Sequence, residues 1–288
     1  MMLLKTVSEL NDFLNMSGRS GKTLGFVPTM GSLHEGHLSL IRAAKASCSL
    51  VIVSVFVNPT QFGPNEDFTQ YPRDLDRDCH LAFSTGADAV FSPEVDEIYP
   101  PGAGTTVDVS GALSETLCGA SRPGHFKGVA TVVTILFNIV RPDAAYFGQK
   151  DAQQALLIKK MVRDLHMPVS VVICPIVREE DGLAMSSRNV YLSPAERREA
   201  VCLNAGLQKA ADYLRSGQPD AHQKDKLVSI IKNHIKAQPL ANIDYVEIRD
   251  SETLTDIREI APGKTALAAV AVRFGKTRLI DNRLLTAD

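Results

Sequence analysis

The chain has 288 residues, of which 44% are hydrophobic and 22% are charged, and its formal net charge at pH 7 is −2. This composition is ordinary for a globular protein of one large or two modest domains. Because proteins that bind nucleic acid normally carry a basic stripe, the near-neutral charge argues against a nucleic-acid partner.

The N-terminus and the cysteines predict a cytoplasmic location. The segment M-M-L-L-K-T-V-S-E-L has its charges too early and its apolar run too short for a signal peptide. The longest apolar stretch, residues 129–140, is interrupted by polar residues and too short to span a bilayer, so we expect no membrane partner. The five cysteines are odd in number and scattered, which is typical of reduced thiols. The first predicted element is an amphipathic helix over residues 5–16.

Residues 24–47 predict a strand, a tight turn and a helix. The apolar run from residue 24 ends at Pro28, which cannot donate a hydrogen bond to a sheet and so marks the end of a strand. Gly31 permits a tight turn, and a helical period of apolar residues follows from His37. Such a unit presents backbone N–H groups and a positive helix end to an anion.

Two histidines, His34 and His37, stand three residues apart at the start of this helix, with Gly36 between them. Both rings can therefore face one side, where imidazoles beside a helix N-terminus suit phosphate. A pair of surface residues or caps is an equally good interpretation of the two histidines alone. Zinc is less favoured because a third ligand with recognisable spacing is missing, so we expect no metal held by the protein itself.

The next strand is predicted over residues 50–57, a β-branched run typical of a parallel strand covered on both faces. Asn58 and Gln61 follow it directly, and ligands bind at the carboxyl ends of strands in open α/β sheets. Both residues are therefore candidates for substrate binding. Simple turn formation is an equal alternative for Asn58, whereas Gln61 has no turn preference.

Residues 71–81 predict a helix with aspartates at positions 74, 76 and 78. The D-x-D-x-D pattern imitates a calcium loop, but it lacks the glycine at position six and the closing glutamate. We therefore expect a solvated helix face here. Further strands are predicted over residues 87–92 and 105–109.

Arg122, His125 and Lys127 lie within six residues, just before the apolar helix predicted over residues 129–140. Three basic groups at the start of a helix form a second feature that favours an anion. A solvated basic turn is the alternative for any one of them.

Lys150 follows a strand predicted over residues 144–147 and stands at the N-terminal end of the next helix. A cation there is disfavoured by about 0.3–1 kcal/mol, and a bound phosphate explains its position. Asp151, the next residue, can be explained as a cap of that helix rather than as part of a phosphate site. Gln154, one turn further on, is expected to face the same side as Lys150.

The last part of the chain changes character after a strand predicted over residues 169–177. Ser186, Ser187 and Arg188 follow in a polar loop and offer donors to phosphate oxygens. Helices are then predicted over 194–214 and 224–236, and strands over 243–249, 265–274 and 277–281, the last two joined by a hairpin turn at 275–276. The predicted fold class is therefore α/β: a Rossmann-like parallel sheet with helices on both faces over residues 1–177, plus a smaller α+β C-terminal lid domain over residues 178–288.

Six motifs occur in order between Pro28 and Asn189: P-T-M-G-S-L-H-E-G-H, S-V-F-V-N-P-T-Q-F, Y-P-R, S-R-P-G-H-F-K-G-V, Y-F-G-Q-K-D-A-Q-Q and G-L-A-M-S-S-R-N. Together with L-I-D-N near the C-terminus, they resemble the pantoate–β-alanine ligase family, within the nucleotidyl-transferring H-x-G-H superfamily. Gln149 stands where glutamate is more usual.

The resemblance implies a cytoplasmic homodimer that uses ATP as a substrate, with Mg²⁺ carried mainly by the phosphates. It implies a reaction in which ATP and (R)-pantoate form pantoyl adenylate and diphosphate, after which β-alanine displaces AMP to give pantothenate. Its ATP site maps onto Met30, Gly31, Ser32, Leu33, His34, Glu35, Gly36, His37, Gly148, Gln149, Lys150, Asp151, Val177, Met185, Ser186, Ser187 and Arg188. Its proton donor is His37, and its pantoate-binding glutamines are Gln61, which also borders the β-alanine position, and Gln154.

The residue types fit what this chemistry needs. A carboxylate that attacks a phosphate must overcome like-charge repulsion, so donors aimed at the developing charge are the main catalytic resource. The candidate donors are His34, His37, Lys150, Ser186, Ser187 and Arg188. Two rivals stay open: a nucleotidylyltransferase acting on a phosphorylated cofactor precursor, and a catalytically silent nucleotide-binding regulator.

Overall fold

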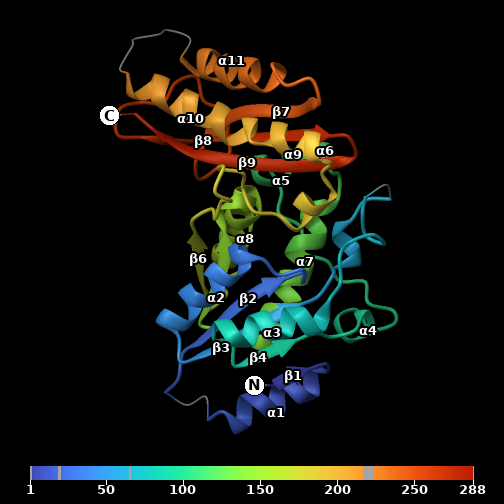
Figure 1. Cartoon of the computed structure of the whole chain (residues 1–288). Helices are drawn as coiled ribbons and strands as arrows, with labels where there is room; N and C mark the ends of the chain where they lie inside the picture. The colour runs from blue at the N-terminus through green and yellow to red at the C-terminus, as the bar shows by residue number, and fades with distance from the viewer. Residues whose placement is uncertain (1, 19–20, 65, 217–222, 288) are drawn as a thin grey trace. The chain divides into compact units, whose positions relative to one another are not determined.

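The structure is a computed structural model that describes residues 2–18, 21–64, 66–216 and 223–287 (Figure 1). The chain forms two compact units. The first comprises Met1–Val109, Arg122–Gln149 and Leu157–Pro175, and the second comprises Ser110–Ser121, Lys150–Leu156 and Ile176–Asp288. Two short segments from the first 177 residues thus belong to the second unit.

A six-stranded parallel sheet forms the centre of the first unit. Its strands are β1 (Met2–Leu4), β2 (Leu24–Thr29), β3 (Leu50–Val55), β4 (Ala89–Phe91), β5 (Ala144–Gly148) and β6 (Ser170–Cys174). They lie in the order β1-β4-β3-β2-β5-β6. The chain adds β3 and β4 on one side of β2 and then crosses to add β5 and β6 on the other side, so the sheet has a topological switch point between β2 and β5. Such a switch point is where open α/β sheets bind ligands. The loops after β2 and β5 are therefore the first places to look for a site.

Helices cover both faces of this sheet, as predicted. The helical elements of the first unit are α1 (Val7–Met16), α2 (Glu35–Ser47), η1 (Pro59–Gln61), α3 (Leu75–Thr85), α4 (Val95–Ile98), α7 (His125–Val140) and α8 (Ala152–Asp164). The first turns of α8, up to Leu156, belong to the second unit. Apolar side chains of α2 and α3 form one core cluster with Val27 and Val53. The residue before Val27 in β2, Phe26, points to the opposite face of the sheet and meets Phe137 of α7, with ring centroids 6.4 Å apart.

Two predictions about strands in this unit are wrong. Strand β2 runs through Pro28 to Thr29, pairing with β3 over its whole length. The backbone of Thr29 faces β3, because its carbonyl accepts a hydrogen bond from the N–H of Phe56. Pro28 therefore faces the β5 side, where pairing has already ended at Phe26 and no donor is needed. Residues 105–109 form no strand.

The second unit contains an antiparallel sheet in the order β7-β8-β9. Its elements are α5 (Ala112–Glu115), α6 (Cys118–Ser121), η2 (Gln149–Asp151), η3 (Ser187–Tyr191), α9 (Pro194–Ala200), α10 (Cys202–Arg215), α11 (Gln223–Lys236), β7 (Ala241–Asp250), β8 (Thr265–Phe274) and β9 (Thr277–Thr286). Helices α10 and α11 bury apolar residues against one face of the sheet. The α+β character and the hairpin are as predicted, but the helix expected over 194–214 is divided at Val201 and the last strand extends beyond residue 281.

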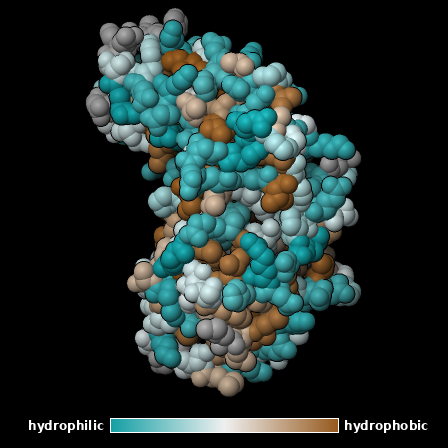
Figure 2. Space-filling view, viewed as in Figure 1, coloured by the Kyte–Doolittle hydropathy of each residue, from teal (hydrophilic) through white to brown (hydrophobic). Residues whose placement is uncertain are grey.

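The surface of the chain is mixed. Figure 2 shows apolar side chains interspersed among hydrophilic ones on the face in view. Exposed apolar residues of this kind are normal for folded proteins. None of the described helices is both long enough and apolar enough to cross a membrane.

A glycine in α7 sets the distance between this helix and η1. A Cβ atom added to Gly128 would lie 2.3 Å from the carbonyl oxygen of Thr60 and 2.8 Å from the amide nitrogen of Gln61. The backbone after β3 therefore approaches α7 closely only because this residue has no side chain.

We expect Gly128→Ala to lower the free energy of unfolding by about 2 kcal/mol. Alanine is favoured over glycine in a helix by about 1 kcal/mol, but a methyl group 2.3 Å from a backbone oxygen places the packing cost at the top of its usual range of about 1–3 kcal/mol. Urea unfolding measures the change. Gly104→Ala is the matched control, because nothing lies within 4 Å of a Cβ added there. A variant of Gly128 as stable as the control would show that the contact is not tight.

Candidate active site

The turn after β2 is built on a buried carboxylate. Gly31 and Ser32 have φ angles of 80° and 51°, and a Cβ on Gly31 would lie 2.8 Å from Oδ2 of Asp78. The backbone N–H groups of Ser32 and Leu33 donate to this carboxylate at 2.8 and 2.7 Å. Asp78 is only 1% exposed, so the prediction of a solvated aspartate face is wrong for this residue. Burial raises the pKa of Asp78, and its two backbone hydrogen bonds partly oppose that shift.

The two histidines lie together at the start of α2, with ring centroids 4.1 Å apart. Nδ1 of His37 accepts a hydrogen bond from the N–H of His34 at 3.3 Å, and Nδ1 of His34 accepts one from the N–H of Gly36 at 3.1 Å. A nitrogen that accepts from a backbone N–H carries no proton. Both neutral rings therefore hold their proton on Nε2.

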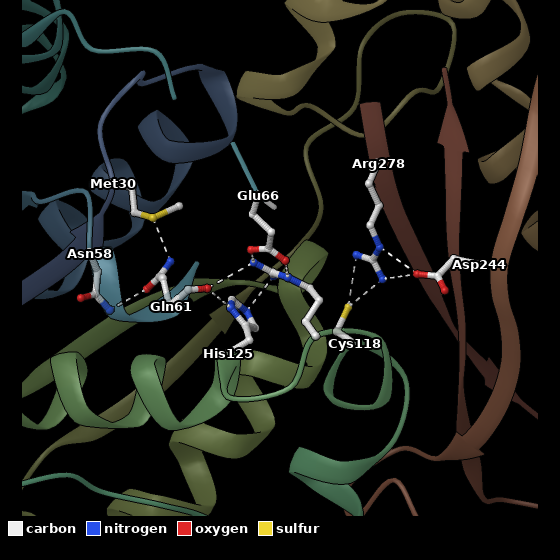
Figure 3. A network of polar contacts seen from close by, with 9 residues as sticks. Met30, Asn58, Gln61, Glu66, Cys118, His125, Asp244 and Arg278 are labelled. Atoms are coloured by element: carbon white, nitrogen blue, oxygen red, sulfur yellow. Dashed lines mark hydrogen bonds and ion pairs between the residues drawn. The ribbon is translucent and has the colours of Figure 1, made fainter. Parts of the chain in front are cut away.

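Asn58 and Gln61, which follow β3, form a cluster with Met30, which follows β2 (Figure 3). Gln61 is 8% exposed, and its Nε2 donates to the thioether sulfur of Met30 at 2.8 Å. Because a thioether is a weak acceptor, the N–H group of Gln61 would form a stronger hydrogen bond with an oxygen acceptor. Its oxygen accepts from Nδ2 of Asn58 at 3.2 Å.

Asn58 is 1% exposed and uses both ends of its amide inside the protein. Its oxygen accepts from Thr60 and Tyr99, and its nitrogen donates to the carbonyl of Gly128 as well as to Gln61. These contacts favour a role for Asn58 in positioning Gln61. Direct contact of Asn58 with a substrate stays a prediction.

Arg122, just before α7, and His125, the first residue of α7, are connected to the backbone of Gln61 (Figure 3). Lys127 lies within α7, because this helix begins four residues earlier than predicted. Arg122 pairs with Glu66 and also contacts Nε2 of His125 at 2.9 Å. Arginine has only donors, so Nε2 of His125 accepts and Nδ1 carries the proton, which is donated to the carbonyl of Gln61 at 2.7 Å. Burial raises the pKa of Glu66, but the hydrogen bond and charge of Arg122 outweigh it and leave that pKa lowered.

Lys150 lies in η2, directly after the end of β5, and its backbone is held from the C-terminal sheet. Nδ2 of Asn282, a residue that is 4% exposed, donates to the carbonyl of Lys150 at 2.9 Å. The neighbouring Asp281 accepts two hydrogen bonds from Arg178, at 2.7 and 2.9 Å. The L-I-D-N segment of β9 thus anchors the turn that carries Lys150.

The segment with Ser186, Ser187 and Arg188 is held at its base. The N–H of Met185 donates to the carbonyl of Val177 at 3.0 Å, and the hydroxyl of Ser186 caps η3 by accepting from the N–H of Arg188 at 3.2 Å. Asn189 contacts Glu179 at 2.7 Å, and Arg197 pairs with both Glu179 and Asp181. Hydrogen bonds of Met185 and Asn189 therefore hold the two ends of this segment, and the ion pairs of Arg197 hold the loop that Asn189 contacts.

The two glutamines of α8 differ in environment. Gln153 is buried, accepts from the N–H of Cys118, and donates to the carbonyls of Leu113 and Thr116. Gln154 is half-buried, and Asp151 before it is exposed. Gln153 thus has a structural role that the sequence did not indicate, while Gln154 stays a candidate ligand-binding residue.

The contacts within each unit join some of the predicted residues directly. In the first unit, Gly31 to His37 share one turn and Met30 meets Gln61, while Glu35 pairs with Arg42 and Gly148 ends β5. In the second unit, Val177 meets Met185. The sequence indicated neither the role of Asp78 nor the pairing of Arg122 with Glu66, and it offered Asn282 only as part of the L-I-D-N motif. Within the described ranges, no group of three or more His, Cys, Asp or Glu residues has the arrangement of a metal site.

Comparisons with known proteins match nearly the whole chain to one enzyme family. A family model described as "Pantoate-beta-alanine ligase" matches residues 2–284. The pantothenate synthetases of Pelotomaculum thermopropionicum and Acetivibrio thermocellus are 56% and 54% identical, covering 99% and 98% of both chains in each pair. The crystal structure of the pantothenate synthetase from Thermus thermophilus matches with a TM-score of 0.92 at 47% identity, covering 98% of this chain and 99% of that one.

The pantoate–β-alanine ligase of Francisella tularensis, solved in complex with β-γ ATP and β-alanine, matches with a TM-score of 0.78 at 35% identity. The alignment covers 99% of this chain and 97% of that one.

Proposed function

Because this chain belongs to the pantoate–β-alanine ligase family, we propose that the candidate residues of the two units bind ATP and pantoate and stabilise the charge that develops on phosphate. The enzyme condenses (R)-pantoate with β-alanine in an ATP-dependent reaction that passes through pantoyl adenylate and releases AMP and diphosphate. The observation that carries the residue assignment is the pairing of His34 and His37 at a helix N-terminus, where backbone N–H groups hold both rings through Nδ1.

In the first step, the pantoate carboxylate attacks the α-phosphorus of ATP. The amide of Gln61 exchanges the sulfur of Met30 for an oxygen of pantoate, because an oxygen is the stronger acceptor. Gln154 supplies a second amide to pantoate. The Nε2–H groups of His34 and His37 donate hydrogen bonds to phosphate oxygens. A neutral imidazole is too weak an acid to give up its proton, so His37 acts as proton donor to the leaving diphosphate after it has taken up a second proton on Nδ1 beside the bound phosphates.

Lys150, Ser186, Ser187 and Arg188 act as further donors to the phosphates. The ammonium, hydroxyl and guanidinium groups match the charge that builds up on the phosphate oxygens in the transition state. Backbone groups of the Met30–His37 turn, of Gly148, Gln149 and Asp151, and of Val177 and Met185 bind the rest of the nucleotide. Donors that are already in position cost no reorganisation when charge develops on the phosphate. Asp78, Asn282 and Arg197 hold the segments that carry these donors.

In the second step, the amine of β-alanine attacks the acyl carbonyl of pantoyl adenylate, a C–N bond forms, and the C–O bond to AMP breaks. No covalent enzyme intermediate is required. Holding the adenylate and the amine in one site replaces a bimolecular encounter, an effect worth up to about 7–11 kcal/mol of the barrier.

Several finer assignments are part of the same proposal. Mg²⁺ arrives with ATP and is held chiefly by phosphate oxygens and water. Residues 1–177 bind nucleotide and pantoate, and residues 178–288 act as a lid. The enzyme is a cytoplasmic homodimer, which light scattering on the purified protein tests.

Product analysis by mass spectrometry tests the function directly. We expect AMP and diphosphate only when pantoate, ATP and Mg²⁺ are all present, and pantothenate only after β-alanine is added. A panel of phosphorylated cofactor precursors covers the rival nucleotidylyltransferase. Adenylylation of one of them in place of pantoate would favour that rival.

A further inference from the structure

A cluster of charged side chains joins β9 to the turn at residues 178–184. Successive residues of a strand point to opposite faces, so Asp281 and Arg283 share one face of β9 while Asn282 points to the other. Both oxygens of Asp281 bind Arg178, because Oδ1 accepts from Nη2 at 2.9 Å and Oδ2 accepts from Nη1 at 2.7 Å. Asp281 therefore neutralises Arg178, and its own side chain is fully buried.

Arg283 has no such counter-charge. Its Nη2 donates to Oδ1 of Asn204 on α10 at 3.1 Å, and a side-chain amide carries no net charge. Its Nε is buried and lacks a hydrogen-bond partner among the described residues. In the part of the chain that the structure describes, no carboxylate forms an ion pair with Arg283. A buried donor without an acceptor destabilises the fold, and more so when it belongs to a charged group.

The charges around Arg283 do not compensate for this. Burial lowers the pKa of Arg283, and the positive charge of Arg178 lowers it further. The charge of Asp281 acts in the opposite direction, but Arg178 already uses both of its oxygens. Asp212 and Arg215 of α10 pair with each other, and their charges act on Arg283 in opposite directions. Because arginine keeps its proton at neutral pH, these three arginines and two aspartates leave one positive charge in excess.

We propose that Arg283 is the centre of an anion site in the second unit, which takes a small oxyanion of the phosphate class. An oxyanion at this guanidinium supplies the acceptor that Nε lacks and the negative charge that the cluster lacks. Arg283 is half-buried, so part of its surface faces solvent. None of the residues proposed to bind ATP or pantoate belongs to this cluster, and the inference therefore goes beyond the proposed function.

Asn204 links this site to a functional segment of the same unit. It contacts Arg283 through its oxygen, and a Cβ atom added to Gly182 would lie 2.6 Å from its Nδ2. Gly182 belongs to the turn that precedes the segment 186–188, and its carbonyl accepts from Arg178 at 3.0 Å. An anion bound at Arg283 is therefore expected to stabilise the second unit, including the base of this segment.

Thermal unfolding in phosphate and in chloride at equal ionic strength tests the site. Arg283→Met removes the guanidinium and keeps an unbranched stem. As phosphate approaches saturation, the melting temperature of the wild type should rise about 2–4 °C above its value in chloride, and Arg283→Met should lose most of this rise. In chloride, Arg283→Met should melt at the wild-type temperature or above it, because the orphaned donor and the excess charge are gone. A purely structural arginine predicts a lower melting temperature in both salts with an unchanged rise, which would overturn the proposal.

A second variant supplies the missing charge from the chain itself. Asn204→Asp keeps the size of the side chain and places a carboxylate against Arg283. Its melting temperature in chloride should therefore exceed that of the wild type, and most of its response to phosphate should disappear. A response equal to that of the wild type would contradict the proposal. Arg163→Met, at an exposed arginine of α8, is the matched control and should keep the full response.

Two further measurements identify the source of the phosphate effect. Glycerol 3-phosphate should raise the melting temperature as inorganic phosphate does if the site takes a phosphate group carried by a metabolite, whereas a rise with inorganic phosphate alone assigns the site to the free ion. In a Lys150→Ala background, Arg283→Met should remove the same part of the rise. If that part is already absent in Lys150→Ala, the response belongs to the proposed ATP site and the anion site at Arg283 is refuted. None of these measurements uses turnover, so their outcome does not depend on the proposed function.

Discussion

Replacing Lys150 by alanine is expected to lower kcat about 100- to 1000-fold, the usual cost of removing one donor to a developing charge. The KM for pantoate should change much less, because the proposed partner of the ammonium is phosphate. Lys150→Arg keeps the charge but changes its geometry, so its kcat should lie between that of the wild-type enzyme and that of Lys150→Ala. Steady-state rates of AMP formation give kcat, and pantoate-dependent exchange of diphosphate into ATP reports the first step alone.

The position of Lys150 supports this expectation. Its carbonyl is held by the buried amide of Asn282, so the turn keeps its geometry when the side chain is removed. Lys159→Ala is the matched control, because Lys159 is an exposed lysine of α8. An unchanged kcat in Lys150→Ala would remove the residue from the phosphate site, and a higher KM for pantoate at constant kcat would move it to pantoate binding.

The sequence predicted the parallel sheet because its strands are covered on both faces and appear as continuous apolar runs. It also predicted the histidine pair, since spacing along one helix decides which side chains share a face. The strand predicted over residues 105–109 does not form, which shows how little a five-residue segment indicates by itself. Pro28 was misplaced as a strand end because sequence does not show which neighbour each residue of a strand faces.

Contacts between distant parts of the chain could not be predicted in this way. Asp78 accepts from residues 46 and 45 positions earlier, and nothing in D-x-D-x-D distinguishes it from the two other aspartates. Asn282 meets a carbonyl 132 positions away, although the L-I-D-N motif gave a signal. The tautomers of the histidines depend on backbone N–H groups whose directions are set only by the folded turn.

Replacing Asp78 by alanine is expected to lower kcat/KM for ATP about 100-fold or more. The change leaves the N–H groups of Ser32 and Leu33 buried without their acceptor, at a cost of about 1–3 kcal/mol for each. The turn can recover these bonds only by moving, and a shift of about 1 Å in a catalytic group costs roughly 100-fold in rate. Kinetics at varied ATP measure the loss, and urea unfolding shows how much of it comes from stability.

The pH dependence provides an independent check on Asp78. Its pKa is raised in the folded protein, so its ionisation makes the fold less stable as the pH rises through that pKa. The ionised form is nevertheless the one whose two oxygens both accept from the turn. ATP binding should therefore weaken as the pH falls through a range above that of an ordinary aspartate.

The exposed Asp76 of the same helix gives the matched control for both tests. Asp76→Asn should keep the wild-type kcat/KM for ATP and its acid limb. Asp78→Asn keeps the size of the side chain, but its NH₂ group opposes one of the two backbone donors, so its kcat/KM should be low throughout and lack that limb. Wild-type kinetics in Asp78→Asn would show that the turn does not depend on the carboxylate.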